Sequence, residues 1–174
     1  MQLPFRRLPK SLIIDGVEYP IRTDFRFWLA LPELEDLSVL FLGKNPSFMR
    51  YFSQGAIEKI VEFYHCGKEV EQNESGVNVL DFKIDENLIY SAFKQAYNID
   101  LYDLETDELH WYKFKALLDG LPPNTALSKV IEIRAYDGDD PDYKKLRDKF
   151  ALPGKLTEEQ EVAGKKFDEV FFFF

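Results

Sequence analysis

The first two apolar runs of the chain are short and flank a turn signal. Leu12–Ile14 and Val17–Ile21 lie on either side of Asp15-Gly16. This arrangement is typical of a β-hairpin, because glycine tolerates the positive φ that a tight turn needs. The pattern predicts a two-stranded hairpin at about residues 11–22, followed by a helix that Thr23 or Asp24 caps. The apolar face of that helix contains Phe25, Trp28, Leu29 and Leu31.

After this helix, apolar residues recur every three or four positions through most of the chain. Such spacing is typical of helices that bury one face. Pro32 ends or kinks the first helix, and helix resumes over Glu33–Leu42. Further helices are predicted at 54–64, 84–97, 107–120, 125–134, 141–150 and 157–170. Their main apolar stripes are Ile57, Ile60, Val61 and Tyr64; Ile84, Leu88, Ile89, Ala92, Phe93, Ala96 and Tyr97; Trp111, Phe114, Leu118 and Leu121; Leu127, Val130, Ile131 and Arg134; and Tyr143, Leu146 and Phe150.

Capping and stop signals mark the ends of these helices. They are Asn98 as a stop, Thr106 or Asp107 as a start, Asn124 or Thr125 as a start, Asp140 before Pro141 as a start, and Thr157 with Gln160 as a capping box. The predicted fold is mainly α, a multi-helix orthogonal bundle with a small N-terminal β-hairpin. Residues 1–152 are predicted to form a single helical domain, and residues 153–174 a C-terminal helical extension ending in a Phe-rich tail.

The final helix ends in an apolar stripe. Phe167, Val170, Phe171 and Phe174 are spaced i, i+3, i+4, i+7. Several phenylalanines exposed to water would favour aggregation. The stripe therefore either packs on its own domain or binds a partner or a second copy of the chain, and we take it as the candidate partner-binding site. The other prominent aromatic and histidine residues are expected to be core or structural: Trp28, Phe93, His110, Trp111 and Phe114.

Charge and composition narrow the classes of function. The net charge of −9 disfavours binding to nucleic acid, which requires clustered positive charge. Cys66 is the only cysteine, so no intramolecular disulfide is possible and a reducing compartment is expected. No signal peptide is visible, and no apolar run approaches the roughly 20 residues that span a bilayer. These features predict a cytoplasmic location and no membrane partner.

The chain contains no recognisable arrangement for catalysis or metal binding, so we expect neither catalytic residues nor metal ligands nor a cofactor. His65 and Cys66 are adjacent, and adjacent helical residues do not face each other. The acidic stretch Asp137–Asp142 lacks the glycine and glutamate that a calcium loop needs at its sixth and twelfth positions. A solvated connector with a helix cap is the preferred interpretation. These observations predict that the protein is not an enzyme.

Two segments in combination resemble a known protein family. One is Leu12–Trp28, and the other runs from Asp81-Phe82 through His110-Trp111 and Gly120-Leu121-Pro122 to Arg134. Together they resemble the "gene product fifteen" family of siphophages and prophages of Gram-positive bacteria, over about Leu8–Leu152. The resemblance implies a tail assembly chaperone that binds and solubilises the tape measure protein. It implies the host cytoplasm, and partners that include the tail tube protein and further copies of the chain.

Two other functions stay open at this point. The protein can be a minor structural tail or head–tail joining protein that is retained in the virion. It can also be an acidic mimic of DNA that inhibits host nucleases, which requires carboxylates spaced like phosphates along one face. The mixed lysine and glutamate pattern from Lys144 to Lys166 argues against the mimic.

Overall fold

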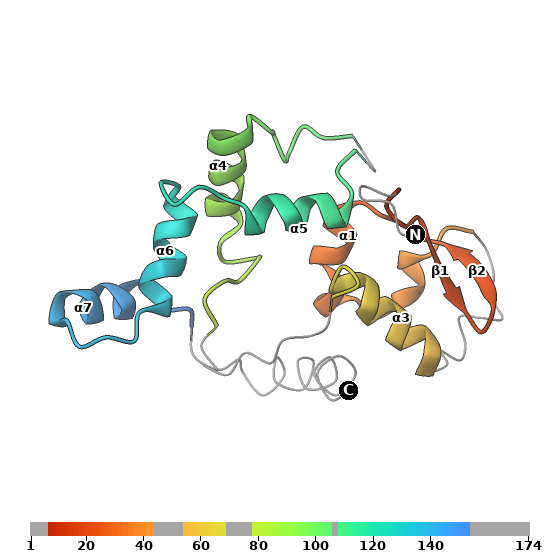
Figure 1. Cartoon of the computed structure of the whole chain (residues 1–174), viewed down its shortest axis with the longest axis horizontal. Coiled ribbons are helices and arrows are strands. Elements are labelled where there is room, and N and C mark those ends of the chain that lie inside the picture. Colours follow the sequence, from red (N-terminus) through yellow and green to blue (C-terminus); the bar gives the residue numbers. More distant parts are fainter. Residues whose placement is uncertain (1–6, 44–53, 69–77, 106–107, 154–174) are drawn as a thin grey trace, which may run out of the picture. The chain divides into compact units, whose positions relative to one another are not determined.

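The computed structural model describes residues 7–43, 54–68, 78–105 and 108–153 (Figure 1). These residues contain six α-helices, two short 3-10 helices and one two-stranded sheet. The prediction of a mainly α fold with a small N-terminal hairpin is confirmed. The chain divides into two compact units. The first contains residues 7–43, 54–68 and 108–113, and the second contains residues 78–105 and 114–153. The prediction of one domain over 1–152 with a separate extension stays a prediction.

The predicted hairpin is present at the start of the first unit (Figure 1). Strand β1 (Ser11–Ile14) pairs antiparallel with β2 (Val17–Pro20). Asp15 and Gly16 have φ values of 50° and 80°, as a tight hairpin turn with two positive φ angles requires. Leu12 and Ile14 alternate with exposed neighbours and are buried. One face of β1 therefore belongs to the core of this unit.

Helix α1 (Phe25–Leu29) begins where the sequence predicts. The Asp24 carboxylate accepts a hydrogen bond from the Arg26 backbone N–H at 3.0 Å, which satisfies one of the unpaired donors at the helix N-terminus. Phe25 and Trp28 are buried. The Trp28 indole N–H donates to the Arg22 carbonyl oxygen at 2.8 Å, so the largest side chain of the helix also satisfies its polar atom.

The predicted helix over Glu33–Leu42 is wrong. The segment forms two 3-10 turns instead, η1 (Leu31–Glu33) and η2 (Leu37–Leu40). Pro32 lies in the first turn of η1, where its missing N–H costs nothing. Leu34 and Asp36 are both extended, and Asp36 caps a new turn. The apolar residues do recur at helical spacing in this segment. Pro32 and the side-chain cap at Asp36 nevertheless divide the backbone into two short turns.

Helix α3 (Gln54–Tyr64) has the predicted bounds, but its buried face is rotated from the predicted one. Ile60 is buried as expected, together with Ala56 and Phe63. Ile57, Val61 and Tyr64 are only half-buried. The Phe63 ring centroid lies 4.3 Å from that of Trp28 and 4.8 Å from that of Tyr112. The helix packs against β1, and this aromatic group forms the centre of the first unit.

Helix α5 (Trp111–Asp119) has its first three residues in the first unit and the rest in the second. The predicted caps Thr106 and Asp107 lie outside the described residues, and Leu109 and His110 are not helical. Trp111 is fully buried, and its indole N–H donates to the Tyr64 carbonyl oxygen at 2.8 Å. This bond ties the start of α5 to the end of α3.

The second unit contains α4 (Glu86–Tyr97), α6 (Ala126–Ala135) and α7 (Pro141–Phe150) together with the rest of α5 (Figure 1). Helix α4 ends at Asn98, which has a left-handed φ of 54°. Thr125 caps α6 and Asp140 caps α7. The predicted ends of these helices are therefore confirmed. The rings of Phe93 and Phe114 stack at 5.1 Å in the core.

A buried ion pair joins three segments of the second unit. The Arg134 guanidinium donates to the two carboxylate oxygens of Asp85 at 2.6 and 3.0 Å. It also donates to the carbonyl oxygens of Val79 at 3.0 Å and Phe150 at 2.7 Å. Arg134 is 6% exposed and Asp85 1% exposed. Asp85, which precedes α4, therefore neutralises the charge of Arg134 on α6. Arg134 also binds the end of α7 through the Phe150 carbonyl oxygen.

Some predicted stripes are wrong at their edges. Ile84 precedes α4 and is 53% exposed. Tyr143 and Leu146 of α7 are also exposed, and α7 contains no fully buried residue. This short helix is strongly polar. Its contacts include the capping bonds at Asp140, the bond from Arg134 to the Phe150 carbonyl oxygen, and the packing of Tyr143 on Tyr136 with ring centroids 4.7 Å apart.

Candidate interaction surface

The acidic connector and the histidines show no site for a metal ion. Within the described parts of the chain, no group of three or more histidine, cysteine, aspartate or glutamate side chains is arranged to hold a metal. Asp140 caps α7 through the backbone N–H groups of Asp142 and Tyr143. His65 and Cys66 lie at the end of α3. These residues have structural surroundings, and we assign no chemistry to them.

The residues expected to be core or structural are all buried. Trp28, Phe93, Trp111 and Phe114 are 0% exposed, and His110 is 6% exposed. The His110 ring lies between two backbone groups. Its Nδ1 accepts from the Tyr112 N–H at 3.0 Å, and its Nε2 lies 2.9 Å from the Pro9 carbonyl oxygen. A ring that accepts at Nδ1 donates at Nε2, so this network selects the neutral tautomer protonated at Nε2.

The stripe that the sequence predicts to bind a partner lies outside the described residues. Phe167, Val170, Phe171 and Phe174 belong to the segment 154–174. Their role as a binding site stays a prediction.

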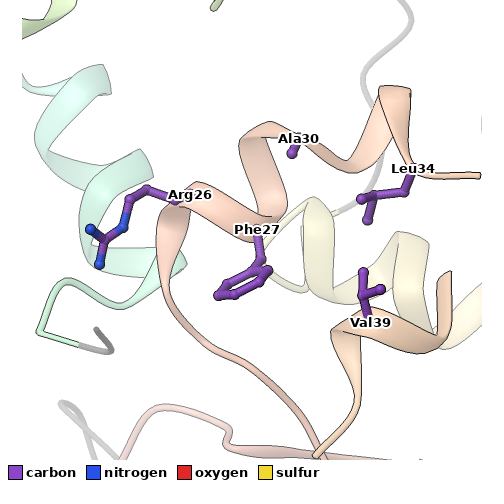
Figure 2. A pocket seen from close by; sticks show the side chains of 5 residues that line it. All are labelled: Arg26, Phe27, Ala30, Leu34 and Val39. Carbon is purple, nitrogen blue, oxygen red and sulfur yellow. The ribbon is translucent and has the colours of Figure 1, made fainter. Parts of the chain in front are cut away.

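An apolar recess lies on the first unit, on the side of α1 opposite its buried residues. At 100° per residue, Phe25 and Trp28 face the core, so Arg26, Phe27 and Ala30 face outward. These three residues line the recess together with Leu34 and Val39. Figure 2 shows Ala30, Leu34 and Val39 pointing toward the space beside the Phe27 ring, whereas the Arg26 side chain extends away from it. We call this recess the α1 hollow.

Arg22, which follows β2, contacts two residues that line the α1 hollow. Its guanidinium carbon lies 4.8 Å from the centre of the Phe27 ring, within the range of a cation–π contact. Its Nε donates to the Val39 carbonyl oxygen at 2.9 Å. One arginine therefore contacts α1 and η2 together, and it orients two of the apolar residues of the hollow.

The cap of η2 sets the direction of Val39. The Asp36 carboxylate accepts from the backbone N–H of Ser38 at 2.8 Å and from its hydroxyl. These bonds, the hydroxyl first, hold the pKa of Asp36 below its ordinary value. The turn that follows buries Leu40 and leaves Val39 39% exposed. The local cap thus presents an aliphatic side chain to the surface.

The lining of the α1 hollow is suited to docking of apolar side chains. The volume of the hollow is about 480 Å³, and four of its five lining residues are apolar. The fifth, Arg26, forms a bidentate pair with Asp24, which is 0% exposed. The hollow can accept apolar side chains, and its lining carries no nucleophile and no general base. Sequence reasoning missed it because Phe27, Leu34 and Val39 fall outside every predicted stripe.

Comparison with known proteins identifies the chain. A sequence model of the family described as "Bacteriophage Gp15 protein" matches residues 6–152, which is most of the chain. The chain belongs to this family. The resemblance expected from the two sequence segments is therefore confirmed. No curated protein and no solved structure gives a match.

Membership in the Gp15 family makes the chain a bacteriophage protein and indicates a role in the structure or the morphogenesis of the phage particle. None of the helices in the described parts of the chain is long and apolar enough to cross a membrane. For a protein of particle assembly, the α1 hollow is the candidate site at which another protein segment binds.

Proposed function

We propose that the protein is a non-enzymatic tail assembly chaperone. It binds the tape measure protein of its phage in the host cytoplasm and keeps this protein soluble until tail tube subunits assemble around it. One observation carries the proposal, namely the exposed apolar α1 hollow on a protein of the Gp15 family.

The physical reasoning concerns the client. A long helical protein exposes apolar faces until it is enclosed, and exposed apolar surface favours aggregation. A recess lined by Phe27, Leu34 and Val39 can cover the apolar residues of one helical turn. The net charge of −9 keeps such a complex soluble. Many copies bound along one client give a strong total interaction from weak individual contacts.

The test is co-expression of the protein with the tape measure protein of the same phage. We expect the tape measure protein to move into the soluble fraction and to co-purify with this chain. Expression of the tape measure protein alone is the control. A tape measure protein that stays insoluble and does not co-purify contradicts the proposal.

Mass spectrometry of purified virions separates the chaperone from its structural alternative. A chaperone is absent from the finished particle or present well below the copy number of the tube subunits. A minor tail or head–tail joining protein is present at a fixed copy number, and that result would replace the proposed function.

A further inference from the structure

We propose that the protein associates with further copies of itself through two surface patches of the second unit, one acidic and one basic. The acidic patch lies on α4 and on the segment that follows this helix, and the basic patch lies on α7. The acidic patch of one copy binds the basic patch of the next. This association is separate from the proposed function, because it involves no client.

The acidic patch is built on two stacked tyrosine rings. The ring centroids of Tyr90 and Tyr102 lie 4.7 Å apart, and Tyr102 is 60% exposed. The Tyr102 hydroxyl donates to the Glu86 carboxylate at 3.1 Å. The Tyr90 hydroxyl donates to an Asp100 carboxylate oxygen at 3.2 Å, and the Lys94 ammonium donates to the same oxygen at 3.2 Å. We call Tyr90, Tyr102, Glu86 and Asp100 the tyrosine platform.

The tyrosine platform fits a cationic side chain. The Tyr102 ring stacks on Tyr90 through one face, and its high exposure leaves the other face open to solvent. An aromatic face attracts an arginine or lysine that lies within about 6 Å of its centre. The Tyr102 hydroxyl is bonded to Glu86, so a cation over this ring also approaches a negative charge. The platform therefore favours a basic partner surface that carries an apolar side chain beside its cations.

Helix α7 carries a surface of this kind. At about 100° per residue, Tyr143, Leu146 and Phe150 lie within about 60° of one another on one face. Tyr143 is 40% exposed and Leu146 is 38% exposed. Arg147 and Lys149 flank this face on opposite sides, about 40° and about 60° from its edges. We call these five residues the α7 stripe.

In the part of the chain that the structure describes, the two cations of the α7 stripe have no acidic partner. Arg147 donates to the Tyr136 carbonyl oxygen at 3.1 Å, and the Lys149 ammonium lies 5.6 Å from the centre of the Phe150 ring. The other two lysines of the helix are paired with nearby aspartates. A carboxylate of a second copy can therefore bind Arg147 or Lys149 without breaking an ion pair.

Charge indicates a second copy as the partner. The net charge of −9 makes two copies repel each other unless an acidic patch of one meets a basic patch of the other. Helix α6 packs against both α4 and α7, so every copy presents both patches on one compact unit. A contact between two different patches leaves one platform and one stripe open in each pair of copies. Association therefore continues from copy to copy.

Salt dependence tests the contact on the unmodified full chain. At about 0.05 M salt, we expect analytical ultracentrifugation to detect species larger than a monomer, in amounts that rise with protein concentration. Raising the salt to about 1 M shortens the Debye length to about 3 Å, and we expect association to weaken at least about tenfold. A chain that stays monomeric at low salt, or one whose association strengthens with salt, would overturn the proposal.

Two variants that each lack one patch test the pairing of platform and stripe. Leu146→Glu with Lys149→Glu disables the α7 stripe, and Tyr102→Ser with Glu86→Gln disables the tyrosine platform. We expect each variant alone to be monomeric at low salt. An equimolar mixture should form a dimer and nothing larger, because one intact platform and one intact stripe remain for each pair of molecules.

The matched control for the stripe variant is Ile13→Glu with Lys10→Glu. It makes the same side-chain changes at exposed positions of the first unit, and we expect it to associate as the parent does. Association that persists in either patch variant would assign the contact to another surface. A mixture without the dimer would show that the platform and the stripe do not bind each other. Either result would overturn the proposal.

Discussion

The two compact units satisfy their buried polar atoms by different means. In the first unit, the indole N–H groups of Trp28 and Trp111 each donate to a backbone carbonyl oxygen at 2.8 Å. In the second unit, the guanidinium of Arg134 is paired with Asp85 inside the core. Loss of a neutral donor leaves one carbonyl unsatisfied, whereas loss of Arg134 leaves an uncompensated carboxylate. Loss of Arg134 should therefore cost more stability than loss of either indole N–H. The first unit also contains a buried carboxylate, Asp24, but its partner Arg26 is 42% exposed, so water reaches that pair.

The exposed apolar residues also differ between the units. In the first unit, the large exposed hydrophobic residues are all aliphatic: Ile13, Val17, Val39 and Leu42. In the second unit, two of the corresponding four residues are tyrosines, and the Tyr102 hydroxyl donates to Glu86 at 3.1 Å. An aliphatic side chain forms no hydrogen bonds with water. Covering the exposed residues of the first unit with a partner is therefore more favourable than covering those of the second. Of these four aliphatic residues, Val39 lines the α1 hollow.

The largest expected effect tests the buried ion pair. Arg134→Met leaves the Asp85 carboxylate buried without its partner, and we expect the free energy of unfolding to fall by about 3–5 kcal/mol. Chemical denaturation followed by circular dichroism measures the change. Lys144→Met is the matched control, because Lys144 is 43% exposed and pairs with the exposed Asp139. We expect the control to lose less than about 1 kcal/mol. Similar losses in both variants would contradict the structural role of Arg134.

An intermediate effect is expected in the first unit. Trp111→Phe removes the indole N–H and leaves the Tyr64 carbonyl oxygen without that donor. We expect a loss of about 2 kcal/mol in the same measurement, from the lost N–H bond and the smaller side chain. A loss larger than that of Arg134→Met would reverse the comparison between the units.

Much of the local structure follows from the sequence, whereas the contacts between distant segments do not. Asp15-Gly16 predicts the hairpin turn, and Thr125 and Asp140 predict two helix starts, because each signal acts within a few residues. Asp85 and Arg134 are 49 positions apart, and no periodicity connects them. Such a pair is visible only once the helices are packed.

The candidate site shows the same limit. The stripe on α1 correctly predicts that Trp28 is buried, but it says nothing about what the outward residue Phe27 contacts. The hollow depends on the turn at η2, where Asp36 rather than apolar periodicity determines the local structure. The fold class and the family were predictable from the sequence. The residues that line the hollow could be recognised only in the folded structure.

The smallest effect concerns pH. Burial, with a contribution from Cys66, raises the pKa of Tyr64 above its ordinary value of 10.0. The folded state therefore holds the phenol proton more tightly than the unfolded state. The resulting stability is fully present below the unfolded pKa and is lost as the pH rises through the folded pKa. Between about pH 9 and pH 11, we expect the parent to lose more stability than Tyr64→Phe, by roughly 1 kcal/mol or less. Parallel pH profiles would contradict this assignment.

The central claim is that the α1 hollow binds the tape measure protein, and paired charge substitutions test it most directly. Ala30→Glu with Val39→Glu places two carboxylates in the hollow, and Ile13→Glu with Val17→Glu places two at exposed positions of the hairpin. Both pairs replace exposed residues and change the charge equally, so both variants should fold. In co-expression with the tape measure protein, we measure the amount of this client that co-purifies. We expect this amount to fall at least about tenfold with the hollow variant, and to stay within about twofold of the parent's amount with the hairpin variant. Equal recovery with both variants would contradict the account.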